Sequence, residues 1–420
     1  MLIRLLYSLL LAFLSPVLLY SLYKKKAGKP SFGPRWKEHF GFTPKTNADQ
    51  PIWIHAVSVG EVIAAIPIIQ GIKQQCPEQA IVVTTTTSTG AAQLSKLGEL
   101  IEHRYMPIDF AWCVKGFLRQ VKPAQLLIIE TELWPNTLHC VAKAGIPISV
   151  LNARLSERSA KRYAKFQFIF NQLAQNLSQV LCQYSSDAER FIALGLTQQQ
   201  VHVTGSVKFD INVPSSALEQ GQVLRAQIGK HRSVWVASST HQGEDEIVLA
   251  AHTQLQQSLP NALLIIVPRH PERFEQVFNL ANSFGFETVK RSSGATITNN
   301  TNVYIADTMG EMLTILASAD ICFMGGSLIG DKVGGHNFLE PAALSMATLT
   351  GPSFYNFAEI AHLLMEKQAL SVCDNAPEIS AKLTELFNHC ERRLQMGQAA
   401  LQVVESNRGA LSKTLTLIRH

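Results

Sequence analysis

Charged residues are scarce in this chain of 420 residues: they make up 16% of it, while hydrophobic residues make up 46%. The usual charged share is about 25%. Intrinsic disorder is excluded, because it requires low hydrophobicity and high net charge. Heptad repeats and a regular glycine period are also absent, which excludes a coiled coil and a collagen-like fibre. The mean hydropathy of +0.09 is too low for a protein of many membrane-spanning helices but high for a soluble enzyme, so we expect some apolar surface to meet lipid.

Cysteine is present only as seven scattered residues, an odd number without a CxxC motif. A disulfide framework and a zinc site are therefore not expected, and a reducing compartment fits best. No predicted strand end carries a DxD motif or a His/Asp pair with the spacing of metal ligands. We therefore expect no metal and no other cofactor.

Positive charge is concentrated in one segment. The formal net charge is +5, and six cations lie within residues 24–37: Lys24, Lys25, Lys26, Lys29, Arg35 and Lys37. The rest of the chain is close to neutral, so it has no broad electrostatic footprint for nucleic acid. Nucleic acid is not an expected partner.

An uncharged apolar run, Leu5–Tyr23, precedes this cationic cluster. About 18–20 such residues cross a bilayer core as a helix, and Lys/Arg mark the cytoplasmic side. No small-residue cleavage site follows. We predict that residues 1–23 form a retained membrane anchor with the body on the cytoplasmic side. The alternative is a monotopic hairpin or an interfacial helix broken at Ser15-Pro16.

Short apolar runs alternate with helical patterns from Pro51 onward, as in a parallel sheet covered on both faces. Residues 210–232 are polar and lack strand patterns. The sequence thus predicts an α/β protein with two Rossmann-like, doubly wound domains: a first domain at 24–209, a linker at 210–232 and a second domain at 233–420. The predicted strands are Ile52–Ala56, Ile81–Thr85, Gln125–Ile129, Ile148–Leu151, Val180–Gln183, His202–Thr204, Val234–Ser238, Ala262–Val267, Val303–Ala306, Ile321–Met324 and Ala347–Leu349.

Polar residues after strands are the candidate site residues, because ligands of such sheets bind at the C-terminal strand ends and, with two domains, by default in the cleft between them. In the first domain, Gly60 permits a tight turn that brings Glu61 to the first turn of a helix, where the helix N-terminus stabilises the ionised carboxylate that a general base needs. The alternative is a purely capping Glu61. Glu130 and Glu132 follow another apolar strand, where a solvated loop is the alternative. Lys208 leaves the last strand of this domain, although a lone lysine is usually only solvated.

The second domain has similar strand ends. Segment 237–244 is a strand, a turn rich in hydroxyls and glycine, and a helix; its N–H groups are a weak signal for an anion. Arg269, after Pro268, has the planar fork that suits phosphate, with a structural cap as the alternative. Glu311 repeats the strand–turn–Glu arrangement. Five glycines at 325–335 permit close backbone approach to a ligand, although they also fit a plain connection, and Glu340 beyond them has a carboxylate suited to ribose hydroxyls.

Six motifs occur in one order behind the apolar N-terminus: SVGE (58–61), TELWPN (131–136), GSVKFD (205–210), PRHPERF (268–274), DTMGE (307–311) and GGHNFLEP (334–341). Together they resemble the 3-deoxy-D-manno-octulosonic acid (Kdo) transferase family of lipopolysaccharide assembly, from the anchor to about Pro352. The resemblance implies an inverting glycosyltransferase of GT-B architecture, with 24–209 as the acceptor domain and 233–420 as the nucleotide-sugar domain. It would move Kdo from CMP-Kdo to the lipid A precursor (lipid IVA) at the cytoplasmic face of the inner membrane, without a metal.

The same resemblance implies roles for individual residues. Glu61 would be the catalytic base, and Glu130 and Lys208 would stabilise the transition state. The loop between Ser327 and Gly334 is longer than the family leads us to expect. The implied CMP contacts are Pro268, Arg269, Met309, Gly310, Glu311, Asn337, Phe338, Leu339 and Glu340.

Two other readings remain open from the sequence. One is a different GT-B enzyme, such as a UDP-sugar transferase or a sugar-nucleotide epimerase. The other is a non-catalytic, membrane-tethered binder of nucleotide sugars, which would have no need of Glu61, Glu130 and Lys208. The partners expected under the favoured reading are CMP-Kdo, lipid IVA and the lipid of the inner membrane.

Overall fold

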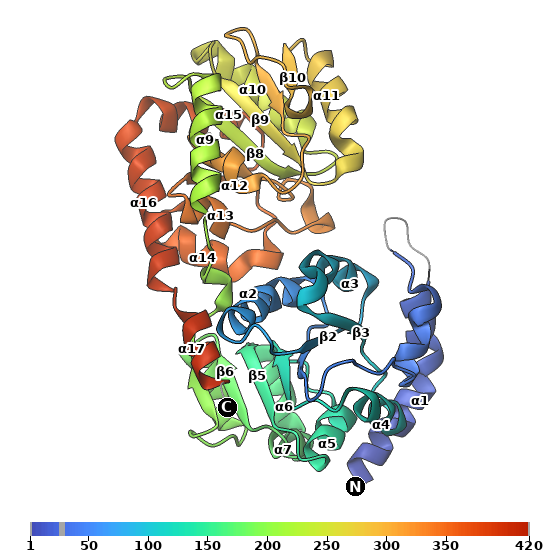
Figure 1. Cartoon of the computed structure of the whole chain (residues 1–420). Coiled ribbons are helices and arrows are strands. Elements are labelled where there is room, and N and C mark those ends of the chain that lie inside the picture. Colours follow the sequence, from blue (N-terminus) through green and yellow to red (C-terminus); the bar gives the residue numbers. More distant parts are fainter. Residues whose placement is uncertain (1, 25–29, 419–420) are drawn as a thin grey trace. The chain divides into compact units, whose positions relative to one another are not determined.

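The computed structural model describes residues 2–24 and 30–418, and the chain divides into two compact units. Unit 1 consists of residues 1–210 and 408–420, and unit 2 of residues 211–407 (Figure 1). Each unit contains a seven-stranded sheet in which every strand pair is parallel. The predicted class, two Rossmann-like α/β domains, is confirmed.

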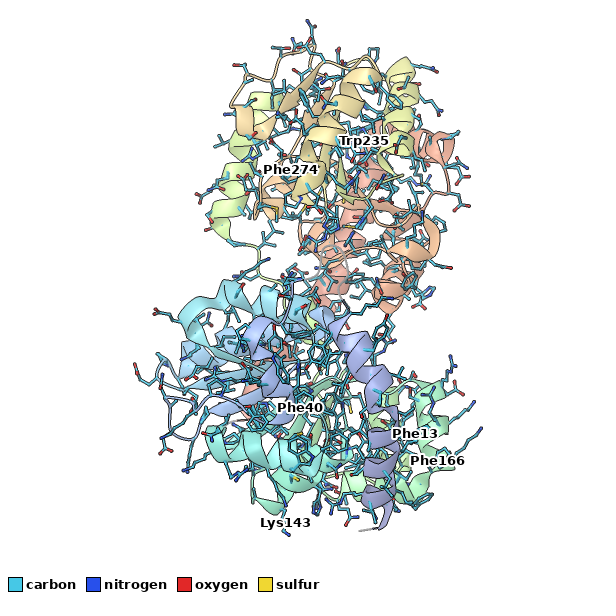
Figure 2. All side chains as sticks on the ribbon, turned by 90° about the vertical axis from the view of Figure 1, so that its right-hand side faces the viewer. Phe13, Phe40, Lys143, Phe166, Trp235 and Phe274 are labelled. Atoms are coloured by element: carbon cyan, nitrogen blue, oxygen red, sulfur yellow. The ribbon has the colours of Figure 1, made fainter. Side chains whose placement is uncertain are left out.

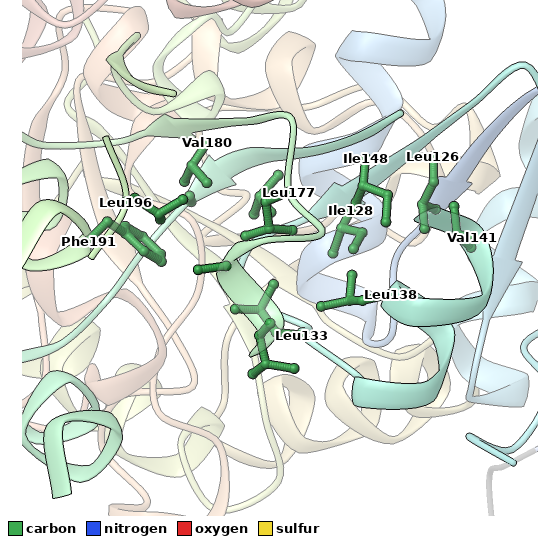
Figure 3. Packing of buried hydrophobic residues seen from close by; sticks show 14 of the residues in the cluster. Leu126, Ile128, Leu133, Leu138, Val141, Ile148, Leu177, Val180, Phe191 and Leu196 are labelled. Atoms are coloured by element: carbon green, nitrogen blue, oxygen red, sulfur yellow. The ribbon is translucent and has the colours of Figure 1, made fainter. Parts of the chain in front are cut away.

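The sheet of unit 1 has the order β3-β2-β1-β4-β5-β6-β7, so its winding direction reverses between β1 and β4. Side chains alternate between its two faces. Trp53 and Ile128 belong to the core on one face, part of which Figure 3 shows, and Ile54 and Ile129 belong to the core on the other. The strands are β1 (Ile52–His55), β2 (Ile81–Thr85), β3 (Glu102–Tyr105), β4 (Gln125–Ile129), β5 (Ile148–Ala153), β6 (Gln179–Cys182) and β7 (Val201–Val203).

Helices connect these strands, and one returns from the end of the chain. Asp210 fixes that return, because its carboxylate accepts the N–H groups of Gly409 and Leu411 at 2.7 and 2.6 Å. The helical elements of unit 1 are α1 (Leu2–Tyr23), η1 (Gly33–Phe40), α2 (Val59–Gln75), α3 (Ser88–Leu94), η2 (Ser95–Leu100), α4 (Ala111–Val121), α5 (Pro135–Lys143), α6 (Glu157–Lys165), α7 (Gln167–Ala174), α8 (Ser185–Ala193), η3 (Val207–Phe209) and α17 (Ala410–Leu417).

The sheet of unit 2 has the order β10-β11-β9-β8-β12-β13-β14 and reverses between β8 and β12. One core packs Trp235 of β8 against Leu264 of β9 and Phe323 of β12. The strands are β8 (Val234–Thr240), β9 (Leu263–Pro268), β10 (Thr288–Lys290), β11 (Val303–Ile305), β12 (Ile321–Met324), β13 (Ala347–Thr350) and β14 (Leu370–Val372). The helical elements are α9 (Ser215–Ile228), α10 (Asp245–Ser258), η4 (Pro271–Arg273), α11 (Phe274–Ser283), η5 (Arg291–Ser293), α12 (Met312–Ala317), η6 (Gly330–Lys332), α13 (Leu339–Ala343), η7 (Tyr355–Phe357), α14 (Ala358–Glu366), α15 (Ala376–Asn388) and α16 (Cys390–Ser406).

Two expected boundaries differ from the structure. Most of the expected linker 210–232 is helix α9, which packs on α12 of unit 2. Gly221 permits that packing, because a Cβ there would lie 2.5 Å from the Cβ of Ala317. Residues 408–420, expected in the second domain, belong to unit 1, where Leu415 and Ile418 join a buried cluster.

Helix α1 runs unbroken through Pro16, so the alternative of a helix broken at Ser15-Pro16 is wrong. Proline removes one backbone donor, and here the Ser15 hydroxyl donates instead to the Ala12 carbonyl at 2.8 Å. Residues 3–23 are long and apolar enough to cross a bilayer, which is compatible with an anchor. Phe13, which Figure 2 labels on this helix, is exposed to 82% of its surface in the absence of a membrane.

Polar contacts of Ser8 and Tyr23 tie α1 to the rest of unit 1. Asn136 of α5 donates to the Ser8 hydroxyl at 2.9 Å, and the Tyr23 hydroxyl lies 2.7 Å from His39 Nδ1. In Figure 1 the helix lies along one side of unit 1. Lys25, Lys26 and Lys29 of the cationic cluster lie outside the described residues.

Candidate functional site

Glu61 stands in the first turn of α2, directly after β1, one of the two strands at the reversal point of unit 1. Ser58 is the N-cap residue and forms a reciprocal capping box with Glu61. Glu61 Oε1 accepts from the Ser58 hydroxyl at 2.7 Å and the Ser58 N–H at 3.2 Å, and Oε2 accepts from the Val57 N–H at 2.7 Å. Glu61 therefore does cap the helix, as the alternative reading expected, and the capping bonds fix its carboxylate at the end of β1. Gly60 has no positive φ, and a Cβ there would have room. The turn therefore does not require glycine at this position, contrary to the expectation.

Glu61 is only 7% exposed. Burial raises its pKa to about 6, although hydrogen bonds from Ser58 and Val57 oppose the rise and the charges of Glu132 and Glu130 add to it. The expectation that the helix N-terminus would favour the ionised form is thus outweighed by burial. A carboxylate with a pKa near neutrality accepts and releases protons readily at physiological pH. Each carboxylate oxygen has two lone pairs, so one acceptor position on Oε2 remains after the three hydrogen bonds.

Glu130 and Lys208 form an ion pair at the same edge of the sheet. Lys208 Nζ lies 3.1 Å from Glu130 Oε1, and both side chains are about one-third exposed. Glu130 follows β4, the other strand at the reversal point, and its φ of +61° is unusual for a residue other than glycine. Such a conformation costs about 1–3 kcal/mol and is concentrated at functional sites. Lys208 lies in η3, which packs against α2.

Glu132 and Trp134 extend this region. Trp134 Nε1 donates to Glu132 Oε2 at 2.9 Å, and the Trp134 ring meets His55 edge-on with the centroids 5.2 Å apart. Burial raises the pKa of Glu132, although the bond from Trp134 opposes it. The segment is thus a loop that is half-buried and hydrogen-bonded.

The sequence analysis missed Asn152, which positions the Lys208 turn. Asn152 is fully buried at the end of β5, has a φ of +53°, and accepts the Val207 N–H on Oδ1 at 3.2 Å. A single Asn at the end of an apolar run was the available signal, because Asn tolerates the left-handed conformation.

In unit 2 the turn after β8 holds an anion of its own chain. The Glu244 carboxylate, 0% exposed, accepts N–H groups from His241 (2.9 Å), Gly326 (2.6 Å), Ser327 (2.8 Å) and Leu328 (2.9 Å). Of the N–H groups in this turn that were expected to bind an anion, that of His241 is thus already bonded to Glu244. Glu244 joins the loops after β8 and β12, the strands at the reversal point of unit 2.

Arg269 follows β9, and its backbone N–H donates to the Thr240 carbonyl at 3.0 Å, while its side chain is exposed. Its neighbour Arg273 is buried, paired with Asp245, and donates to the Thr240 carbonyl at 3.0 Å. Arg273 therefore supplies the structural cap, and the exposed guanidinium of Arg269 is free to meet a ligand. Pro268 ends the strand beside a bulge between Ser238 and Thr240.

The segment Met309–Glu311 follows β11. Met309 is 62% exposed, and Gly310 has a φ of +83° with open space around it. Glu311 is engaged: Arg291 donates to both of its oxygens, Nη2 at 2.6 Å and Nε at 2.8 Å, and Thr308 adds a further bond. The bonds from Arg291 hold the pKa of Glu311 down at about 2.

Residues 337–340 lead into α13. Phe338 and Leu339 are 0% and 1% exposed, so their side chains belong to the core and only their backbone is available to a ligand. Asn337 Oδ1 accepts the Leu339 N–H at 3.1 Å. Burial raises the pKa of Glu340, while a bond from Asn337 and the charge of Arg269 oppose the rise.

The long loop before these residues is folded back on the segment 353–356. Tyr355 donates to the Asp331 carbonyl at 2.9 Å, and Ser353 to the Gly330 carbonyl at 2.6 Å. Gly334 has a φ of +80° and lies so close to the Tyr355 ring that a Cβ would meet it at 2.5 Å. Within residues 2–24 and 30–418, no group of three His, Cys, Asp or Glu side chains is arranged to hold a metal.

Solved structures share this fold at low sequence identity. MurG of Acinetobacter baumannii matches 88% of this chain and 99% of its own, with a TM-score of 0.53 and 14% identity. A glycosyltransferase from Rickettsia africae matches 88% and 98%, with a TM-score of 0.54 and 12% identity. Two Rossmann-like domains, each with a parallel seven-stranded sheet, define the class by its fold, the GT-B architecture.

Sequence comparison narrows the class. A family model described as "3-Deoxy-D-manno-octulosonic-acid transferase (kdotransferase)" matches residues 34–211. The 3-deoxy-D-manno-octulosonic acid transferase of Haemophilus influenzae is 37% identical over 420 residues, which cover 99% of this chain and 98% of that protein. The chain belongs to the 3-deoxy-D-manno-octulosonic acid (Kdo) transferase family.

Proposed function

We propose that this protein transfers Kdo from CMP-Kdo to lipid IVA, with inversion at the anomeric carbon, at the cytoplasmic face of the inner membrane. The observation that carries the proposal is Glu61, a buried carboxylate with a pKa of about 6 and one acceptor position left. Such a group suits a general base that accepts a proton near neutral pH.

In the proposed reaction Glu61 accepts the proton of the acceptor's sugar hydroxyl. The hydroxyl oxygen then bonds to the anomeric carbon of Kdo, the bond from that carbon to the phosphate oxygen breaks, and CMP leaves with the electron pair. Attack on the face opposite the leaving group inverts the configuration. Glu61 releases its proton to solvent after the product leaves.

Lys208 and Glu130 act on the charges that develop. Kdo carries a carboxylate next to the anomeric carbon, so the positive charge of Lys208 suits either that carboxylate or the departing phosphate. Glu130 at 3.1 Å orients the ammonium group without enclosing it. The strained backbone of Glu130 supports this role, because strain at a strand end is typical of functional positions.

The donor nucleotide is assigned to unit 2. Arg269 supplies an exposed guanidinium for the phosphate, and Glu340 a half-buried carboxylate for the ribose hydroxyls. Phe338 and Leu339 contribute backbone groups only, since their side chains are buried. Met309 and Gly310 form an open turn, whereas Glu311 is held by Arg291 and shapes that turn.

The lipid acceptor and the membrane location are supported by α1. Its exposed apolar side chains, from Leu5 to Tyr20, form a face that water does not favour. The cations that follow the helix favour the cytoplasmic surface. A membrane-bound enzyme and a lipid acceptor then share one surface.

The proposal is tested by incubating the purified protein with CMP-Kdo and tetra-acylated lipid A precursor and weighing the products by mass spectrometry. Addition of one or more Kdo masses is expected. A thermal-shift comparison of CMP, UDP and GDP addresses the alternatives: stabilisation by UDP but not CMP indicates a UDP-sugar enzyme. Binding of CMP without any product from CMP-Kdo indicates a non-catalytic binder.

A further inference from the structure

Two histidines of unit 2 form a direct hydrogen bond beside Arg269. His241 follows β8 and His336 lies in the loop before α13; their Nε2 atoms are 2.9 Å apart. The rings are nearly parallel, at 9°, with the centroids separated by 5.1 Å. None of the roles assigned above uses this pair.

The backbone around the pair is built to hold the two rings together. A Cβ at Gly326, where φ is +71°, would lie 2.9 Å from the His336 ring, so this glycine permits the close approach. The buried Glu244 carboxylate accepts the N–H groups of both Gly326 and His241. One side chain therefore fixes the loops that carry both rings.

The hydrogen bond requires that the pair share a proton, because two protonated Nε2 atoms repel each other. One ring is then the Nε2–H tautomer, and the other accepts with a bare Nε2. Burial lowers the pKa of His241 and of His336, and the charges of Arg269 and His270 lower both further. Without a ligand the pair is therefore neutral at physiological pH.

The charged surroundings of the pair are mostly cationic or already compensated. Exposed Arg269 and His270 follow β9, and Arg273 of η4 is paired with Asp245. Four N–H groups compensate Glu244. On the remaining elements Glu340 is half-buried in α13, and Asp331 and Lys332 of η6 are exposed. An additional anion placed among these groups would favour the protonated form of the two rings.

We propose that the His241–His336 pair contacts the phosphate of the bound nucleotide and takes up one proton from solvent when the nucleotide binds. This inference rests on the proposed function, which assigns CMP to this edge. A phosphate charge about 4 Å away, at an effective dielectric of about 20, raises proton affinity by about a thousandfold. The protonated pair then neutralises phosphate charge together with Arg269, and the proton returns to solvent when CMP leaves.

The test is calorimetry of CMP binding to the full-length protein at pH 7, in two buffers with different ionisation enthalpies. The dependence of the binding heat on the buffer gives the number of protons taken up. We expect about half a proton to one proton per CMP. The nucleoside cytidine, which lacks the phosphate, is expected to bind without proton uptake.

The variants His241→Gln and His336→Gln keep a hydrogen-bonding group but cannot become cationic. Each is expected to take up fewer than about 0.2 protons and to bind CMP about tenfold more weakly. His270→Asn is the matched control, because His270 meets the His241 ring edge-on at 5.3 Å but lies outside the pair. It is expected to retain the uptake of the parent.

The outcomes separate the two proposals. CMP binding without proton uptake in the parent overturns the role of the pair and leaves the proposed donor intact, even where a Gln variant fails to fold. Loss of uptake in His270→Asn, with uptake retained in the Gln variants, assigns the proton to His270 and overturns the inference. No binding of CMP to the parent overturns the proposed donor and the inference with it.

Discussion

The two units have the same sheet topology at their reversal points but opposite charge at the C-terminal edges. In unit 1 the edge carries three carboxylates, Glu61, Glu130 and Glu132, and the pKa values of Glu61 and Glu132 are raised by burial. Lys208 is paired with one of them. The raised pKa values leave this edge able to accept protons nearer to neutral pH.

In unit 2 three acids near the corresponding edge already have protein partners. Glu244 is held by backbone N–H groups, and Asp245 and Glu311 are held by arginines. The guanidinium of Arg269 remains exposed. The proposed function assigns proton transfer to unit 1 and anion binding to unit 2, and this difference lies in the polar residues at the strand ends, since both units are built on a parallel seven-stranded sheet.

The largest expected effect comes from removing the proposed base of unit 1. Glu61→Gln removes the base, so turnover should fall by about 10²–10⁴. The affinity for CMP, measured by calorimetry, should stay the same, because the nucleotide is assigned to unit 2. Turnover close to that of the parent would remove Glu61 from the mechanism.

The matched control for this variant is Glu132→Gln, which neutralises a neighbouring acid of the same unit. Glu132 accepts from Trp134 at 2.9 Å, a bond that the Gln oxygen can keep. Turnover should change by less than about tenfold. Because the charge of Glu132 raises the pKa of Glu61, the acid limb of the pH–rate profile should move to lower pH.

The next effect concerns the anion-binding edge. Arg269→Ala should weaken CMP binding by about 1.5–3 kcal/mol, the usual contribution of a hydrogen bond to a charged group. Calorimetry of CMP binding is the measurement, and Arg392→Ala, at an exposed arginine on α16, is the control expected to leave it unchanged. An unchanged dissociation constant for Arg269→Ala would mean that its guanidinium does not meet the nucleotide.

A pH series sharpens the comparison further. The folded pKa of Glu61 is raised from 4.5 to about 6, so folding favours the protonated form. Its contribution to stability is full below pH 4.5 and is lost as pH rises through 6, by about 2 kcal/mol. The free energy of unfolding, measured with denaturant at a series of pH values, should therefore change differently with pH between pH 4.5 and 6.5 in the parent and in Glu61→Gln. Parallel curves would show that the carboxylate titrates normally.

The sequence predicted the inner strands of both sheets and the edge strand β7, but it missed the other three edge strands. β3, β10 and β14 are short and lie at or next to solvent, so their side chains are mixed: Glu102, His103 and Arg104 lie in β3. Periodicity detects burial, and an edge strand has little of it. What marks β3 is a long-range bond, since Glu38 accepts the Tyr105 N–H at 2.7 Å.

The candidate site, too, could be predicted from the sequence only in part. Motif position placed Glu61, Glu130 and Lys208 at one edge, because parallel strands end on the same side of a sheet. It did not indicate that Glu311 is held by Arg291, that Phe338 and Leu339 are core residues, or that Asn152 positions the Lys208 turn. These features depend on contacts between residues far apart in the chain, which local spacing does not encode.

The smallest expected effect concerns α1, which belongs to unit 1 and has no part in the proposed nucleotide contacts. A chain that begins at Pro30 loses the bond from Asn136 to Ser8 and the contact between Tyr23 and His39. Unit 1 should therefore unfold at a lower temperature, while CMP affinity stays unchanged and solubility rises.

Turnover of the truncated chain on acceptor dispersed in detergent should remain within about tenfold of the parent, because the tether supplies location rather than chemistry. On acceptor embedded in anionic vesicles the rate should fall further and become sensitive to salt, since exposed cations such as Lys37 then attract the protein, by about 1 kcal/mol each. Loss of CMP binding on truncation would contradict this division, because it would make the first helix necessary to the folding of both units.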